Sequence, residues 1–164
     1  SLIACLLAML AVVGHSTAQG GVCATCSAIP SLGAPVNDAC TLVVVAFQRH
    51  DSGTCTLNPA PSCVPHVNCL FSFTVSVTDR GCGVLYWSRH CTQLVDSWGN
   101  PVGLESCGGP TWFPNPTVVT NYPVSCGKRE SIKFERIAAG NSQVIAQPSG
   151  SCTACPAQSD NGGD

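Results

Sequence analysis

Charged side chains are scarce in this sequence. Asp, Glu, Lys and Arg make up 10% of the 164 residues, against about 25% in ordinary soluble domains. Only seven residues are Lys or Arg, and four of these lie in the stretch KRESIKFER (128–136). Nucleic-acid binding depends on a basic surface that displaces counterions from the phosphates. The composition therefore argues against a nucleic-acid partner.

Familiar catalytic motifs are also missing. The sequence has no G-x-S-x-G nucleophile elbow, no H-E-x-x-H zinc motif, no phosphate-binding loop and no EF-hand loop. His50, Asp51 and Ser52 are adjacent, but a catalytic triad converges from separate segments. His66 and His90 share no metal-ligand spacing with His50 or with each other. We expect no catalytic residue, no metal and no cofactor, and hence a protein that is not an enzyme.

Apolar runs long enough to cross a membrane are absent as well. The longest run, LIACLLAMLAVV (2–13), is shorter than the roughly 20 residues that a membrane helix needs. It has the length of a signal-peptide core, and Ser16 and Ala18 after it fit the small-x-small pattern of a cleavage site. We expect residues 1–18 to be a signal peptide that lacks its first residues. The mature protein is then secreted and extracellular, with no membrane span.

Cysteine, in contrast, is abundant. The sequence contains 13 cysteines, and all except Cys5 follow the predicted signal peptide. An even number of cysteines behind an export signal predicts a disulfide framework, so we expect six disulfides and no free thiol. The cysteines concerned are Cys23, Cys26, Cys40, Cys55, Cys63, Cys69, Cys82, Cys91, Cys107, Cys126, Cys152 and Cys155.

Two Cys-x-x-Cys pairs lie near the two ends of the chain, Cys23 with Cys26 and Cys152 with Cys155. They could form a four-cysteine zinc site, a redox site or disulfides. The pairs of compact zinc ribbons lie about 15–20 residues apart, whereas most of the chain separates these two. Neither pair is followed by the helix that lowers a thiol pKa in redox sites. As disulfides, each pair could close on itself or bridge to the other pair. We favour bridges between the pairs, which would clasp the chain ends together.

Strand patterns replace helical periodicity almost throughout. In CLFSFTVSVT (69–78) apolar residues alternate with Ser and Thr, which predicts a strand with one buried and one solvated face. The buried side chains are expected to be Phe71, Phe73, Val75 and Val77. TLVVVAFQ (41–48) is apolar on both faces, which predicts a central strand. Shorter strands are expected at 83–87, 92–95, 116–120, 131–137 and 142–147.

These patterns predict an all-β fold. About seven strands separated by turn signals suit a disulfide-rich antiparallel β-sandwich of immunoglobulin-like size. Residues 19–155 have the length of a single domain, in which the Pro- and Cys-rich residues 52–69 form a stapled loop. The polar residues 156–164 are expected to be a disordered tail.

Aromatic residues are concentrated in residues 96–126, which we expect to form a loop. Rigid aromatic side chains offer wide contact surfaces for sugar rings or protein partners, and the alternative is that they plug the open end of the sandwich. The candidate ligand-binding residues are Trp98, Trp112, Phe113 and Tyr122. Because Trp112 and Phe113 are adjacent, at least one of them should point outward. A disulfide between Cys107 and Cys126 would hold the loop in shape.

The sequence therefore favours a secreted, non-enzymatic structural or adhesive domain of the extracellular space. One alternative is a carbohydrate-binding module that uses the aromatic residues of 96–126. Another is a secreted enzyme or inhibitor without a recognisable motif. The partner is expected to be a glycan or an extracellular protein. Burial of the aromatic side chains separates these hypotheses, because a binding surface requires exposed rings.

Overall fold

The computed structural model describes residues 25–50 and 69–153. The predicted signal peptide (1–18), most of the predicted stapled loop (52–69) and the predicted tail (156–164) lie outside the described residues. Within the described ranges, no helix is long and apolar enough to cross a membrane.

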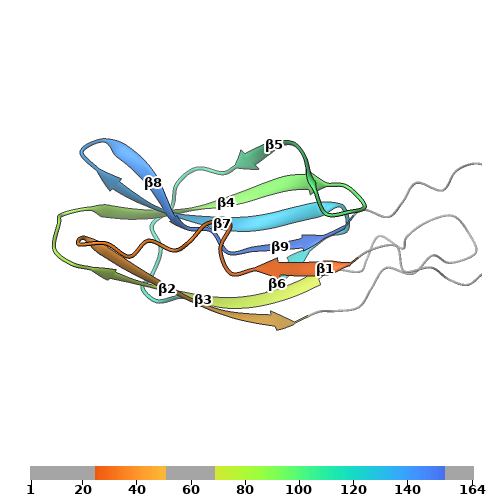
Figure 1. Ribbon diagram of the computed structural model, residues 1–164, viewed down its shortest axis with the longest axis horizontal. Coiled ribbons are helices and arrows are strands. Elements are labelled where there is room, and N and C mark those ends of the chain that lie inside the picture. Colours follow the sequence, from red (N-terminus) through yellow and green to blue (C-terminus); the bar gives the residue numbers. More distant parts are fainter. Residues whose placement is uncertain (1–24, 51–68, 154–164) are drawn as a thin grey trace, which may run out of the picture.

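The described residues form nine strands, and every strand pair is antiparallel (Figure 1). The strands are β1 (Cys26–Ile29), β2 (Thr41–His50), β3 (Cys69–Asp79), β4 (Leu85–Val95), β5 (Pro101–Cys107), β6 (Thr117–Val124), β7 (Lys128–Ala138), β8 (Asn141–Ala146) and β9 (Ser149–Cys152). The expected strands at 83–87 and 92–95 are one continuous strand, β4. The sequence patterns missed β1, β5 and β9, because these strands are short or lack apolar alternation.

The strands form two sheets. A six-stranded sheet has the order β1-β9-β7-β4-β5 with β8 also paired to β7, and a three-stranded sheet has the order β2-β3-β6. Figure 1 shows the sheets as two layers, with β2, β3 and β6 below β4, β7 and β9. This arrangement confirms the prediction of an all-β, disulfide-rich, antiparallel sandwich.

The core lies between the two layers. Phe71, Phe73, Val75 and Val77 of β3 are all buried, with at most 6% of each side chain exposed, as their alternation predicted. From the opposite sheet, Phe134 of β7 is fully buried in the same core. The period of two along β3 therefore places its aromatic and β-branched side chains on the face that meets the second sheet.

The prediction that residues 41–48 form a central strand is wrong. In the described part of the chain, β2 pairs only with β3 and lies at one edge of the three-stranded sheet. Val43 points into the core, but Val44 on the other face is 54% exposed. A run of β-branched residues suits both central and edge strands. The run therefore predicted the strand correctly, but it could not predict the position of that strand in the sheet.

Three disulfides lie within the described residues: Cys26–Cys69, Cys40–Cys82 and Cys91–Cys107. They indicate an oxidising environment. The suggested Cys107–Cys126 bridge is wrong because Cys107 bonds Cys91, its direct cross-strand partner, with Cα atoms 4.1 Å apart. The prediction of six disulfides stays a prediction, since four of the cysteines lie outside the described ranges.

The predicted clasp between the chain ends is correct in place, but Cys26 does not bond the other pair, and Cys23 and Cys155 lie outside the described residues. Strand β1 pairs with β9, and Cys26 lies directly opposite Cys152. The disulfide partner of Cys26 is nevertheless Cys69 of β3, which connects the six-stranded sheet to the three-stranded sheet. The Sγ atoms of Cys126 and Cys152 lie 3.3 Å apart beside this bond. Main-chain pairing thus joins the two ends, while the bond of Cys26 joins the two layers.

Candidate functional site

The aromatic residues of 96–126 do not form one loop. The stretch contains strands β5 and β6, and it runs along much of the sandwich. Trp98 lies in the turn after β4 and is 83% exposed. Trp112 follows Thr111, which bridges to Ser88 near the beginning of β4, and is 68% exposed. The two exposed tryptophans therefore lie near opposite ends of β4 and cannot share one small ligand.

Phe113 belongs to the core, whereas its neighbour Trp112 points outward. Phe113 is 6% exposed, and its ring packs edge-on against Phe134 with centroids 4.9 Å apart. It also contacts the ring of Tyr86, at a centroid distance of 6.5 Å. Adjacent residues on an extended chain face opposite sides. The exposure of Trp112 confirms the prediction that at least one residue of this pair points outward.

Trp112 is exposed and yet held in place. The main-chain N–H groups of Thr111 and Ser88 each donate to the other's carbonyl oxygen at 2.8 Å, which fixes the backbone just before Trp112. The indole of Trp112 meets that of Trp87 edge-to-face, with centroids 6.1 Å apart and planes at 89°. An aromatic ring that is already ordered loses little conformational entropy when it binds a ligand.

A hollow of about 240 Å³ lies beside Trp112. We call it the Trp112 hollow, and it is lined by Val77, Asp79, Val84, Tyr86, Trp112, Phe113 and Asn115. The carboxylate of Asp79 is exposed and accepts one hydrogen bond, from the N–H of Gly81 at 2.9 Å. The side-chain oxygen of Asn115 accepts from the N–H of Val77 at 3.0 Å, and its NH₂ donates to the Val77 carbonyl. An exposed ring, a carboxylate and a fixed amide thus surround one hollow.

A hydrogen-bond network behind the hollow holds Tyr86. The hydroxyl of Tyr86 lies 3.2 Å from the hydroxyl of Thr41, which accepts a hydrogen bond from Arg136 at 2.9 Å. Arg136 also binds both carboxylate oxygens of Asp38, at 2.6 and 3.1 Å. The hydrogen bonds from Arg136 and from the main chain of Cys40 hold the pKa of Asp38 well below its usual value. This network connects the beginning of β2 to β7, and its hydrogen bonds fix the position of Tyr86 in the wall of the hollow.

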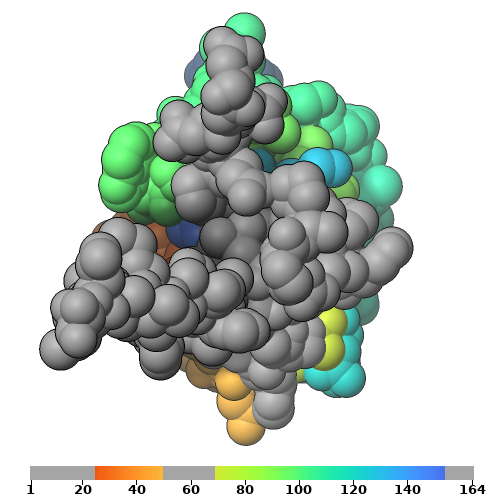
Figure 2. Space-filling model, turned by 90° about the vertical axis from the view of Figure 1, so that its right-hand side faces the viewer, coloured from red at the N-terminus to blue at the C-terminus, as the bar shows by residue number. Residues whose placement is uncertain are grey.

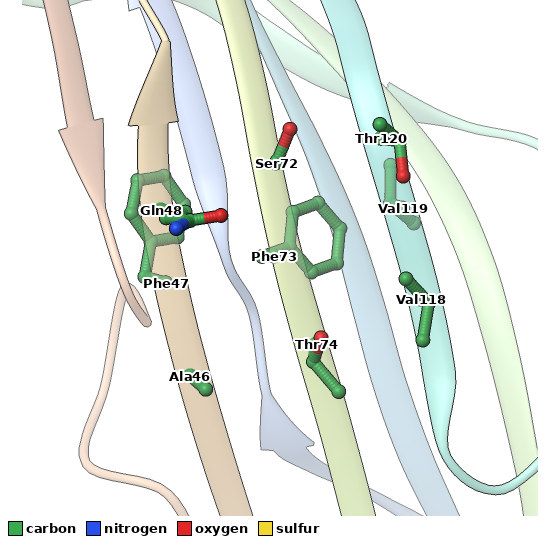
Figure 3. A pocket seen from close by; sticks show the side chains of 9 residues that line it. All are labelled: Ala46, Phe47, Gln48, Ser72, Phe73, Thr74, Val118, Val119 and Thr120. Atoms are coloured by element: carbon green, nitrogen blue, oxygen red, sulfur yellow. The ribbon is translucent and has the colours of Figure 1, made fainter.

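A second hollow, of about 340 Å³, lies on the three-stranded sheet (Figure 3). It is a trough with uncharged walls, and its lining residues are Ala46, Phe47, Gln48, Ser72, Phe73, Thr74, Val118, Val119 and Thr120. Its two rings are those of Phe73, which is 6% exposed, and Phe47, which is half-buried, so neither is as open as the ring of Trp112. Although this trough is larger than the Trp112 hollow, it is therefore the weaker candidate for a carbohydrate site.

Tyr122 lies apart from the other aromatic candidates, next to a histidine and a glutamate. Its ring meets that of His90 with centroids 5.7 Å apart. Glu130 binds Nε2 of His90 at 2.7 Å and accepts from the hydroxyl of Thr92 at 2.9 Å. In a catalytic triad the histidine stands between the hydroxyl and the carboxylate, whereas here the carboxylate stands between the hydroxyl and the histidine. These three groups are thus not arranged as a hydrolytic relay.

The surroundings of Tyr122 predict a loss of stability at alkaline pH. Partial burial and the nearby Glu130 carboxylate raise the pKa of Tyr122 to about 12, whereas a tyrosine of the unfolded chain ionises near 10. Between these values the unfolded state releases a proton that the folded state keeps, so stability falls as pH rises. In urea titrations at pH 9 and 11.5, Tyr122→Phe should reduce this fall. An equal fall in both proteins would contradict the assignment.

Among residues 25–50 and 69–153, two groups of side chains have the composition of a metal site. One contains Cys26, Cys69 and Cys152, with sulfur atoms all within 4.8 Å of one another, and the other contains Cys91, Cys107 and Glu105. In each group a disulfide occupies two of the sulfurs. Zinc binds thiolates, so neither group offers its full set of ligands while these disulfides are intact.

Sequence reasoning missed four residues around Trp112. Asp79 was part of a turn signal, Tyr86 and Trp87 were part of a short strand, and Asn115 was one of several polar residues between prolines. The only feature that these residues share in the sequence is a position near a turn or a strand end. Many residues of an all-β protein have such a position, so it does not single out a site. The packing of the 108–116 connection against β3 and β4 brings them together.

No protein-family model, no curated protein and no solved structure matches this chain. A functional argument for it therefore depends on the chemistry and geometry of its own residues.

Proposed function

We propose that this chain is a secreted, non-enzymatic adhesive module that binds a carbohydrate at the Trp112 hollow. The observation that carries the proposal is the state of Trp112, which is 68% exposed although its backbone and ring are both held in place. A large apolar ring in water is costly, and an ordered exposed ring is the usual platform for the apolar face of a sugar.

The remaining groups of the hollow suit the polar edge of a sugar. The Asp79 carboxylate has oxygen lone pairs beyond the one that accepts from Gly81, and these can accept hydrogen bonds from sugar hydroxyls. The same negative charge disfavours acidic sugars. The hollow therefore fits a neutral sugar, stacked on Trp112 and oriented by Asp79.

The low charge of the chain agrees with this mode of binding. With a net charge of −2 and only 10% charged residues, long-range steering of a charged partner is weak. Affinity then depends on ring contact and on a few oriented hydrogen bonds. A protein partner that inserts an apolar side chain beside Trp112 is the second candidate, because the same exposed ring would serve it.

Replacement of Trp112 by alanine should abolish binding without affecting the fold. We expect Trp112→Ala to weaken the affinity for neutral oligosaccharides at least about tenfold and to leave the melting temperature nearly unchanged. Trp98→Ala is the matched control, because Trp98 is even more exposed than Trp112 but does not line the hollow. A glycan array identifies the ligand, and isothermal titration with soluble oligosaccharides measures its affinity.

Short oligosaccharides are required in this experiment because they cannot bridge two protein molecules. A conservative second variant, Asp79→Asn, should weaken binding while keeping the hollow's shape. Equal loss in Trp98→Ala and Trp112→Ala would contradict the proposal. The absence of any glycan ligand for the wild-type protein would favour the protein-partner alternative.

A further inference from the structure

Four cysteines lie together at one end of the sandwich, and we call them the cysteine cluster: Cys26, Cys69, Cys126 and Cys152. Cys26 begins β1, Cys69 begins β3 and Cys152 ends β9, whereas Cys126 lies in the turn between β6 and β7. Figure 2 looks onto this end of the sandwich, where parts of the chain that are far apart in the sequence meet, from orange to blue. The cluster therefore gathers sulfur atoms from both sheets.

The sulfur positions of the cluster single out one further pair. The Cys26–Cys69 disulfide occupies two of the four sulfurs. The Sγ atom of Cys126 lies 3.3 Å from that of Cys152, whereas a disulfide places its two sulfur atoms about 2.05 Å apart. Small rotations about the Cα–Cβ bonds of the two residues are enough to close the remaining gap.

The main chain already holds Cys126 and Cys152 beside each other. The N–H of Gly127 donates to the carbonyl of Cys152 at 2.8 Å, and the carbonyl of Gly127 accepts from the N–H of Val95 at 2.9 Å. Lys128, the next residue, is the cross-strand partner of Cys152. Hydrogen bonds thus fix the backbone that follows Cys126, so a bond between the two sulfurs requires rotation of side chains rather than movement of strands.

The surroundings of this pair are apolar. Cys152 is almost fully buried in a core group that also contains Phe71 and Val124, and the half-buried Cys126 packs against this group. A thiol is a weak hydrogen-bond donor, and a disulfide has no hydrogen to donate. A bonded pair of sulfurs therefore suits this site better than two thiols do.

We propose that Cys126 and Cys152 are joined by a disulfide, which lies beside Cys26–Cys69 and ties the β6–β7 turn to β9. The three disulfides of the described residues indicate the oxidising environment that this bond needs. Two thiols lose two protons and two electrons as the S–S bond forms. A small-molecule disulfide such as oxidised glutathione takes them up and becomes two thiols.

The additional bond agrees with complete pairing of the cysteines. Together with the three disulfides of the described residues, it leaves an even number of the cysteines that follow the predicted signal peptide. Each remaining cysteine can then find a partner among the others. The remaining cysteines are Cys23, Cys55, Cys63 and Cys155.

The position of the bond explains what it contributes. Its two cysteines are 26 residues apart in the sequence, and the loop between them contains β7 and β8. A disulfide stabilises mainly by restricting the unfolded chain, and the effect grows with the length of the closed loop. The β6–β7 turn also carries the chain from the three-stranded sheet to the six-stranded sheet, so the bond holds the two layers together at this end.

Peptide mapping of the oxidised full chain without reduction tests this pairing. Trypsin cleaves after Lys and Arg, so Cys126 and Cys152 fall in two separate peptides, 90–128 and 137–164. We expect these two peptides to be linked, and electron-transfer fragmentation of the linked species should assign the bond to Cys126 and Cys152. A bond of either residue to any other cysteine would overturn the proposal, as would two alkylated thiols at these positions.

Paired substitutions give a second readout, the number of thiols that react with maleimide in guanidinium chloride. Cys126→Ser/Cys152→Ser should have none, like the control Cys40→Ser/Cys82→Ser, which removes a disulfide of the structure. The crossed control Cys82→Ser/Cys152→Ser should have two, because it removes one partner from each of two bonds. Cys126→Ser/Cys152→Ser should also melt about 10 °C below the wild type. Two reactive thiols in this variant would contradict the pairing, and the map of the wild type decides it even where a variant does not fold.

Discussion

Replacement of Gly150 by alanine is expected to lower the free energy of unfolding by about 3 kcal/mol. Gly150 lies in β9, is buried, and faces the ring of Phe71 from the opposite sheet. A Cβ at this position would come within 2.2 Å of two ring carbons of Phe71. Phe71 is itself only 2% exposed, so its ring cannot move aside without disturbing the core.

Urea denaturation of the oxidised protein measures this effect. The second variant, Phe71→Leu, removes the ring that the new methyl group meets, so the double variant should be more stable than the sum of the two single effects predicts. Gly33→Ala is the control, because a Cβ at Gly33 has nothing within 4 Å. Additive effects of Gly150→Ala and Phe71→Leu would show that the close approach of Gly150 and Phe71 is not the cause.

Replacement of Phe73 by alanine is expected to cost about 3–5 kcal/mol. Phe73 is 6% exposed and belongs to the core cluster that contains Phe134 of the opposite sheet. Its ring also stacks on that of Phe47 at a centroid distance of 6.3 Å, with planes 1° apart. The substitution removes a full ring between two sheets that the Cys26–Cys69 disulfide connects, so the cavity can collapse only in part.

The matched control for Phe73→Ala is Val44→Ala on the neighbouring strand. Val44 is also apolar and in a strand, but it is 54% exposed on the outer face, so its loss should cost well under 1 kcal/mol. Thermal and urea unfolding of both variants, with all disulfides intact, provides the comparison. A near-neutral Phe73→Ala, or equal costs for the two variants, would contradict the placement of this core.

The sequence by itself determined the structural class and the interior of one strand. The alternation of apolar and hydroxyl side chains in residues 69–78 is a local pattern, and the pleat of a strand converts it directly into a buried and an exposed face. The same reasoning placed Phe71, Phe73, Val75 and Val77 in the core. The adjacency of Trp112 and Phe113 likewise predicted that at least one ring would be exposed, because neighbours in extended chain face opposite sides.

Only the tertiary structure decided which strands are neighbours, and hence which residues meet. The apolar run 41–48 forms a strand at any place in a sheet, and only the order of the strands puts β2 at an edge. Cys26 could have bonded several cysteines, and the packing of the two sheets brings it next to Cys69, with Cα atoms 5.6 Å apart. Asp79 and Asn115 meet beside Trp112 because a connection packs across the end of the sandwich. Such contacts depend on register and layer packing between distant segments, which local periodicity does not encode.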